Sequence, residues 1–458
     1  MLGNNHPAFR SSGELTAWHC RPTMLEGASS FHTEEIIQIN AERVVLNNSR
    51  VHQGNSPSHV QVNAREYHHH EATASSLGLR ELYRHIASGA LHNSADRFDA
   101  PKCHPETRKA VQEDILSWAG YGNNDDDPMQ LLWLSGPAGS GKTAIMGTIS
   151  DKFREEGRLA ATFFFSSVSG STDRQSKRRL VTTLAYQLQQ QQGLEPHLSH
   201  LVSAAIRKDP AIFDKNLKEQ MEDSVNDHAF PFRVIISSRP EHHIRHFFTT
   251  LPANYTAQIF LDDKYQPDDD ITLFLSSKFA EIRRRYDHLP PTWPTESNIR
   301  TLVERASGQF IYVATVIRFI DTPPKLPQDQ LNIVLKIRPP EGTNPFASLD
   351  ALYTSILMSS PDPHETVLWL RAYLILQRAY NSWGNVSVRM PAWIYDRFFE
   401  STAGQAQMLL QLPSLVHLVE LGESKTISIS NATYALYHKS FPDFLEDPRR
   451  MQRLPGHP

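Results

Sequence analysis

The spacing of hydrophobic residues predicts an α/β unit in the middle of the chain. From Met129 to Ser237, short apolar runs alternate with stretches in which apolar residues recur every three or four positions. The first pattern is typical of buried strands and the second of amphipathic helices. We expect strands at 129–135, 160–166 and 232–237, and helices at 142–155, 177–190, 196–208 and 214–225. Strands that alternate with helices predict a parallel sheet covered by helices on both faces.

Beyond Pro240 the pattern is mostly helical. Apolar residues keep a helical period and prolines separate the periodic stretches, which predicts helices at 268–285, 297–320, 349–358 and 365–380. The last part of the chain predicts a helix near 404–419, a short strand at 426–429 and a final amphipathic helix near 436–446. A compact mixture of this kind is typical of a winged-helix unit.

The N-terminal part of the chain has a different composition. Residues 1–76 are rich in His, Ser and Asn and have few periodic apolar positions, which predicts a poorly ordered region. Within it, 33–48 has the pattern of one or two strands. Two short helices at 77–88 and 107–118 follow, and then a turn-rich linker at 121–128. The histidines 68–70 and the three aspartates of the linker are better explained as solvated polar groups than as metal ligands.

The sequence GPAGSGKT at 136–143 lies between an expected strand and an expected helix. A phosphate-binding loop needs glycines, because backbone N–H groups can turn toward phosphate oxygens only where no Cβ interferes. Its lysine adds a positive charge for the β- and γ-phosphates, and its threonine hydroxyl is placed to ligate Mg²⁺. The predicted nucleotide-binding residues are Gly136, Pro137, Ala138, Gly139, Ser140, Gly141, Lys142 and Thr143. The strand before the loop and the helix after it disfavour the alternative of a chance glycine-rich turn.

Arg239 is a further candidate, because it follows the strand at 232–237. Open α/β sheets bind ligands at the carboxyl ends of their strands, where an arginine can reach a γ-phosphate. A surface arginine in an Arg-Pro turn is the alternative.

Six segments together resemble one family. They are 78–108, the loop 136–143, FRVIISSRPEHHIR at 232–245, LVERASGQFIYVATVIRFI at 302–320, LDALYTSIL at 349–357 and LYHKSFPDFLEDP at 436–448. In this order they resemble the fungal NACHT-type signal-transduction (STAND) P-loop NTPases whose core is similar to the nephrocystin 3-like N-terminal domain. The resemblance implies the α/β fold class, with a P-loop NTPase parallel sheet followed by a helical bundle and a winged-helix-like unit that fold over bound ATP or ADP and Mg²⁺.

The resemblance also implies roles for single residues. Arg239 corresponds to the sensor arginine, Gly308 lies where the helical bundle approaches the nucleotide, and His438 corresponds to the winged-helix histidine that touches the β-phosphate of ADP. Without the family, His438 is more simply a structural residue. The segment 103–108 corresponds to the stretch near the adenine, in which Cys103 is expected to be a packing residue. The expected regions are a poorly ordered segment at 1–76, a helical segment and linker at 77–128, the NTPase core at 129–250, a helical domain at 251–345 and a winged-helix-like domain at 346–458.

The chain departs from this family at one motif. A P-loop ATPase needs a Walker B strand, in which apolar residues lead into an acid that holds Mg²⁺ and positions water. The interval 215–237 contains Glu222, Asp223 and Asp227 but no apolar strand before them, and it is short by about one strand-plus-helix unit of ~30 residues. We therefore expect the sheet to lack a strand between the P-loop side and 160–166, which would reflect a degenerate copy or a skipped segment. QIFLDD at 258–263 resembles the motif, but it lies after the expected strand at 232–237 that precedes Arg239.

No residue is therefore assigned a catalytic role, and hydrolysis of ATP is doubtful. The interpretation favoured by the sequence is an ATP/ADP-binding signalling switch with Thr143 as its metal ligand. The alternative is a non-catalytic scaffold or decoy with the same fold, whereas a P-loop kinase is disfavoured because no acceptor-substrate or lid motif is found.

Composition narrows the partners. The net charge of −4 argues against nucleic acid, and no apolar run is long enough to predict a membrane span. Two distant cysteines fit a reducing compartment, so we expect a cytoplasmic protein. Adenine nucleotide is the predicted small-molecule partner, and a homo-oligomer or a signalling partner protein stays an open expectation.

Overall fold

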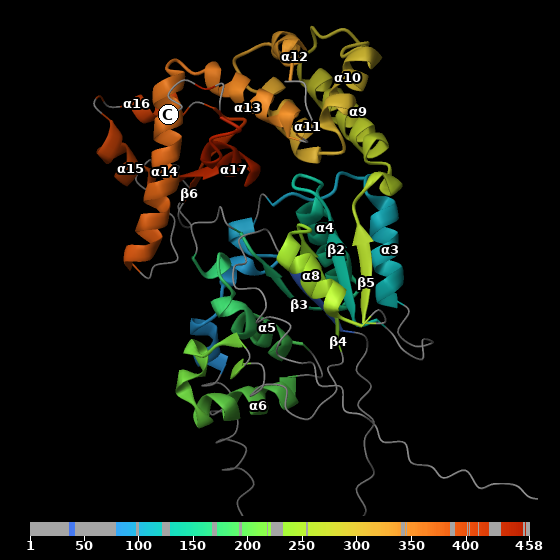
Figure 1. Cartoon of the computed structure of the whole chain (residues 1–458), viewed down its shortest axis with the longest axis vertical. Helices are drawn as coiled ribbons and strands as arrows, with labels where there is room; N and C mark the ends of the chain where they lie inside the picture. Colours follow the sequence, from blue (N-terminus) through green and yellow to red (C-terminus); the bar gives the residue numbers. More distant parts are fainter. Residues whose placement is uncertain are drawn as a thin grey trace, which may run out of the picture.

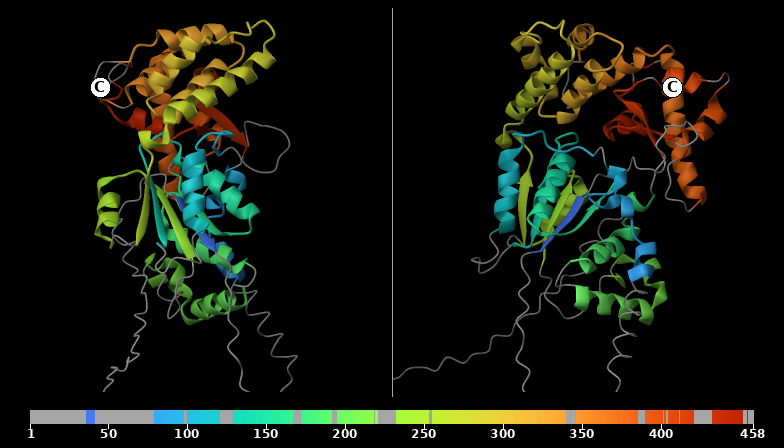
Figure 2. Two further views of the ribbon diagram at one scale, coloured as in Figure 1. Left: turned by 90° about the vertical axis from the view of Figure 1, so that its right-hand side faces the viewer. Right: turned by 180° about the vertical axis from the view of Figure 1, so that it is seen from behind.

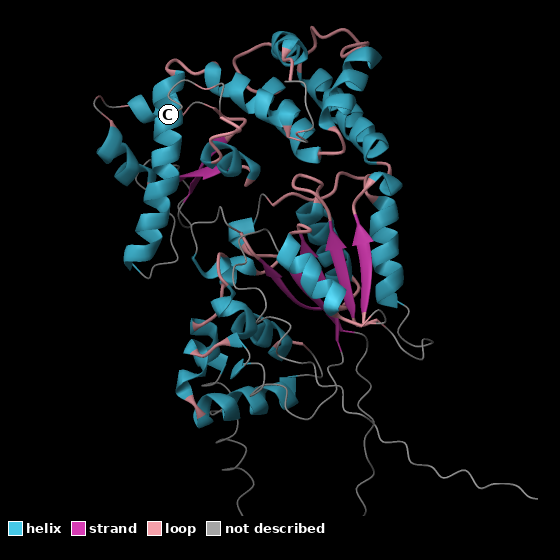
Figure 3. Cartoon of the chain, viewed as in Figure 1, coloured by secondary structure: helices cyan, strands magenta, loops and turns pink. Residues whose placement is uncertain are grey.

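The computed structural model of the chain describes two regions, an α/β unit and a largely helical C-terminal region (Figures 1 and 3). The described residues are 36–41, 79–97, 100–120, 129–166, 172–191, 195–217, 219–220, 232–252, 255–339, 344, 346–384, 390–400, 402, 404–410, 412–420, 432–451 and 454.

A five-stranded sheet forms the centre of the α/β unit. Its strands, in the order β3-β1-β4-β2-β5, are β3 (Leu159–Phe164), β1 (Ile36–Ala41), β4 (Phe232–Ser238), β2 (Leu131–Ser135) and β5 (Thr256–Phe260). Strands β4, β2 and β5 pair in parallel, as the sequence predicts, and β3 runs in the same direction. The predicted α/β fold class is therefore confirmed.

Strand β1 is antiparallel to both of its neighbours, β3 and β4. It occupies the position at which the sequence predicted a missing strand, so that prediction is wrong for the sheet as the structure describes it. The N-terminal segment thus supplies the strand between β3 and β4. Because β1 runs in reverse, its first residue rather than its last lies at the carboxyl edge of the other strands, with Ile36 opposite Ser237.

Alternate residues of the central strands point to opposite faces of the sheet, as strand geometry requires. Leu132 and Leu134 of β2 pack on α3 (Lys109–Gly120) and α4 (Lys142–Glu155), whereas Trp133 points to the other face. Trp133 stacks there on Phe248 of the helix α8 (His242–Thr250), at 4.4 Å between ring centroids. Figure 2 shows α3 and α8 on opposite sides of the sheet.

The remaining elements of this unit cover β3. Helix α5 (Leu180–Gln189) contacts β3 directly, and α6 (Glu195–Lys208) packs on α5. Short 3₁₀ helices complete the unit at Ser88–Ala90, Ala95–Arg97, Thr172–Arg174, Lys177–Arg179, Pro210–Asp214 and Asp263–Tyr265.

The C-terminal region has its own hydrophobic core. Its helices are α9 (Pro267–Arg285), α10 (Glu296–Ala306), α11 (Phe310–Ile320), α12 (Pro327–Lys336), α13 (Ala347–Met358), α14 (Pro363–Gly384), α15 (Ala392–Phe399), α16 (Gln405–Leu409) and α17 (Ser440–Glu446). The single helix predicted at 297–320 is in fact two, because Ser307 and Gly308 have positive φ angles of 46° and 72° and end the first helix.

The end of the chain contains more strand than the sequence predicted. Instead of a helix at 404–419, α16 is followed by the strand β6 (Val416–Glu420), because Pro413 cannot continue the helix. Strand β6 pairs antiparallel with β7 (Ala432–Leu436), which leads into α17. The strand predicted at 426–429 lies outside the described residues.

Candidate phosphate-binding loop and its neighbours

The segment between β2 and α4 has the backbone geometry of a phosphate-binding loop. Gly139 and Gly141 have φ angles of 78° and 90°, which an L-residue adopts only with strain. Gly141 is the N-cap of α4 and provides no side-chain cap for it. The first N–H groups of this 14-residue helix therefore lie at the end of the loop and receive no hydrogen bond from an N-cap side chain.

Lys142 begins α4 and is buried, with 6% of its surface exposed. Its Nζ donates hydrogen bonds to the carbonyl oxygens of Gly136, at 2.9 Å, and Pro137, at 2.8 Å. The ammonium group thus lies across the loop that it follows. Thr143 is the next residue of α4, so its hydroxyl group leaves the same end of the helix.

The start of α11 covers the loop. Ile311 N donates to Gly139 O at 3.4 Å, and a Cβ placed on Gly139 would lie 2.4 Å from Ile311 Cγ2. The C-terminal region therefore rests directly on the turn of the loop. Gly308, which the family resemblance placed near the nucleotide, lies just before α11, and a Cβ placed on it would lie 3.2 Å from Pro267 Cγ at the start of α9.

Arg108 holds the loop from a second side. Its side chain is 4% exposed, and Nη2 donates to Ser140 O at 3.0 Å. Its guanidinium group lies 4.7 Å from the centre of the Phe310 ring, and its backbone N–H donates to the carboxylate of Asp270. Burial lowers the pKa of Arg108, although Asp270 acts in the opposite direction. The residue thus connects the loop with α9 and α11.

Sequence reasoning placed Arg108 in a segment near the nucleotide but missed Asp270, Phe310 and Ile311. Asp270 lies 162 positions beyond Arg108, and no local pattern marks it. Phe310 and Ile311 belong to the family-like segment 302–320, but the sequence does not show that they contact Arg108 or the loop. Cys103, in the same segment, packs against the core of the α/β unit, and burial raises the pKa of its thiol. A packing role for Cys103 fits both observations.

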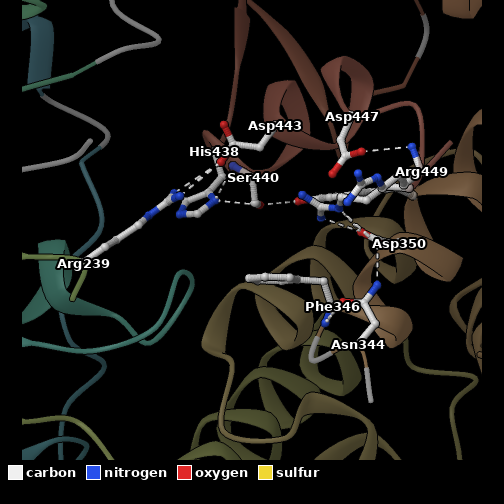
Figure 4. A network of polar contacts seen from close by, with 11 residues as sticks. Arg239, Asn344, Phe346, Asp350, His438, Ser440, Asp443, Asp447 and Arg449 are labelled. Atoms are coloured by element: carbon white, nitrogen blue, oxygen red, sulfur yellow. Dashed lines mark hydrogen bonds and ion pairs between the residues drawn. The ribbon is translucent and has the colours of Figure 1, made fainter. Parts of the chain in front are cut away.

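Arg239 leaves the sheet beside the loop. Ser135 pairs with Ser238, so Gly136 and Arg239 follow paired residues at the same edge of the sheet. Both Nη atoms of Arg239 lie 3.3 Å from Asp443 Oδ2 in α17, which belongs to the C-terminal region (Figure 4).

His438 lies just before α17, in the same polar cluster (Figure 4). Its Nδ1 accepts a hydrogen bond from the backbone N–H of Ser440 at 3.1 Å and lies 2.7 Å from Ser440 Oγ. An acceptor at Nδ1 places the ring proton on Nε2 in the neutral imidazole. The buried hydroxyl group of Tyr353 lies 2.8 Å from Ser440 Oγ and completes the chain of polar contacts. The structure thus brings Arg239 and His438 to one cluster.

Among the Walker B candidates, QIFLDD at 258–263 lies within the described residues. Glu222, Asp223 and Asp227 lie outside the described residues. Asp262 follows β5 on the other side of β2, and its Oδ1 accepts a hydrogen bond from Lys264 N at 3.2 Å. No group of three or more His, Cys, Asp and Glu residues in the described ranges is arranged to hold a metal ion.

Comparison with known families finds a match within the α/β unit. A family model described as Nephrocystin 3, N-terminal, matches residues 111–239, which extend from α3 to the end of β4. This family is associated with NACHT NTPase proteins. No curated protein and no solved structure matches the chain. None of the helices in the described ranges is both long and apolar enough to cross a bilayer.

Proposed function

We propose that the chain is a nucleotide-binding switch of the NACHT type, and that residues 136–143 bind ATP or ADP with Mg²⁺. The observation that carries this proposal is the loop itself. Two glycines with positive φ angles, the uncapped start of α4 and the buried Lys142 form a binding site for phosphate oxygens.

Each part of the loop has a role in this proposal. The N–H groups at the start of α4 donate to the phosphate oxygens of the nucleotide. Lys142 exchanges the carbonyl oxygens of Gly136 and Pro137 for charged phosphate oxygens, which bind an ammonium group more strongly. The Thr143 hydroxyl group would hold Mg²⁺, which would supply positive charge to the phosphates of the nucleotide.

The switch is supported by the contacts between the two regions. Ile311 lies on Gly139, and Asp443 binds Arg239, so the C-terminal region contacts the loop and the sheet edge beside it. A nucleotide in this loop therefore lies close to groups of both regions, and His438 is the residue that we expect to touch its phosphate, as the family resemblance implies. The choice of adenine, a cytoplasmic location and a signalling partner are inferred from the sequence and its resemblance.

A second candidate function is a nucleotide-binding scaffold that does not hydrolyse ATP. Strand β1 favours it, because this strand fills the sheet between β3 and β4 in the reverse direction. Its last residue, Ala41, pairs with Phe232 at the edge of the sheet opposite the loop. The carboxyl end of β1 is therefore remote from the loop, unlike the carboxyl end of a parallel strand.

The test of the proposed function is calorimetric titration of the purified chain and of Lys142→Ala with ADP, ATP and GTP in the presence of Mg²⁺. Removal of a buried charge that pairs with phosphate costs about 2–5 kcal/mol, so Lys142→Ala should weaken binding roughly 30-fold or more. Lys152→Ala, in the last turn of the same helix, is the matched control and should leave the affinity unchanged. Equal affinities in Lys142→Ala and the unmodified chain would refute the assignment.

A further inference from the structure

One ion pair connects the carboxyl edge of the sheet with α17. Arg239 directly follows β4, and Asp443 lies in the first turn of α17. Both Nη atoms of the guanidinium group lie 3.3 Å from the same carboxylate oxygen. The side chains are only 19% and 29% exposed, so water screens this pair less than a pair on the open surface.

The carboxylate of Asp443 has a rigid support. Phe441 and Phe444 of α17 are almost completely buried in the core of the C-terminal region. At the first position of the helix, Ser440 lies within hydrogen-bond distance of the Tyr353 hydroxyl group and of His438 Nδ1 (Figure 4). Helix α17 is therefore fixed to its region, and the backbone of Asp443 moves relative to the sheet only together with that region.

The partner of Arg239 determines what the pair can do. A guanidinium group binds carboxylates and phosphates through the same fork of N–H groups. Arg239 leaves the sheet beside the phosphate-binding loop, so a γ-phosphate there and Asp443 compete for one guanidinium group. The phosphate carries more negative charge than the carboxylate, which favours the exchange.

We propose that Arg239 and Asp443 form an interdomain latch. The latch holds the C-terminal region on the carboxyl edge of the sheet, and a nucleotide with a γ-phosphate opens it by taking Arg239 from Asp443. The first half of the proposal concerns the chain without nucleotide, whereas the second half rests on the proposed function.

Asp443→Asn tests the latch, because it removes the charge and keeps the size of the side chain. Without nucleotide, amide hydrogen exchange should be faster in the peptides that cover 232–239 and 440–446. Glu446→Gln is the matched control, because Glu446 lies on the same helix but pairs with Arg378. The latch is overturned if Asp443→Asn leaves the exchange rates of these peptides unchanged. It is also overturned if Glu446→Gln raises these rates as much as Asp443→Asn does.

Titration with a non-hydrolysable ATP analogue and with ADP tests the opening. Asp443→Asn should raise the affinity for the analogue relative to ADP about fivefold, which corresponds to ~1 kcal/mol. In a chain that already carries Arg239→Ala, Asp443→Asn should have no such effect. An equal effect in both backgrounds, or an unchanged affinity ratio, overturns the opening by γ-phosphate. If the unmodified chain binds neither nucleotide, the proposed function fails, and the exchange experiment still decides whether the latch exists.

Discussion

A methyl group at Gly139 provides a measure of how firmly the C-terminal region rests on the phosphate-binding loop. Gly139→Ala introduces two costs. The φ angle of 78° lies in the left-handed region, which costs an L-residue about 1–2 kcal/mol. The new Cβ would also lie 2.4 Å from Ile311 Cγ2, and overpacking of a buried contact costs a further ~1–3 kcal/mol. We expect a total loss of about 2–5 kcal/mol of unfolding free energy.

Gly157→Ala separates the two costs. Gly157 has a φ angle of 69°, but no atom lies within 4 Å of the Cβ that alanine would add. Urea unfolding of the nucleotide-free chains, followed by circular dichroism, should therefore show a loss of only about 1–2 kcal/mol for Gly157→Ala. In a chain with Ile311→Ala, which removes the opposing methyl group, Gly139→Ala should cost no more than this. Equal losses for Gly139→Ala and Gly157→Ala in the otherwise unmodified chain would show that α11 does not press on the loop.

Three further predictions concern the nucleotide and the pH. His438→Ala should speed ADP release about 10-fold or more in a stopped-flow chase and leave ATP affinity nearly unchanged, because a hydrogen bond to a charged phosphate is worth about 1.5–3 kcal/mol; equal weakening of both nucleotides would mark the histidine as structural. Steady-state phosphate release should be very slow in the unmodified chain, and robust turnover that Lys142→Ala abolishes would require Asp262 to be reconsidered. Burial raises the pKa of Asp396 to about 6 from its ordinary 3.8, although the hydrogen bond from Tyr434 opposes this shift. The folded state therefore binds the proton of Asp396 more tightly than the unfolded state does. The resulting stabilisation is complete below about pH 4 and is lost as the pH rises through 6. Asp396→Asn should reduce the dependence of the free energy of unfolding on pH over this range, and an unchanged slope contradicts the assignment.

The local pattern of the sequence was sufficient for the loop and for the elements on both sides of it. Helix α4 has the predicted bounds, Lys142–Glu155, and β2 lies within the predicted strand. Both elements are determined by residues close in sequence: an apolar run, a glycine-rich turn and a helical period. The break at Ser307 and Gly308 also has a local cause, but a continuous apolar period on both sides concealed it.

Contacts between distant segments were not predictable in the same way. Strand β1 pairs with β4 across nearly 200 positions, and a strand of six residues in a polar segment does not indicate which neighbours it joins. The pair of Arg239 with Asp443 is of the same kind. The sequence predicted that Arg239 binds phosphate. Its carboxylate partner, Asp443, could not be predicted, because the pair depends on how the C-terminal region packs against the sheet.

The most direct test of the central claim, that residues 136–143 hold a nucleotide, is the amount of ADP that the chain retains. Purified chain is incubated with ADP and Mg²⁺, desalted and denatured, and the released nucleotide is quantified per chain. We expect close to one ADP per chain for the unmodified protein and almost none for Lys142→Ala, with Lys152→Ala equal to the unmodified protein. Retention that is absent from the unmodified protein, or equal in Lys142→Ala, contradicts the claim.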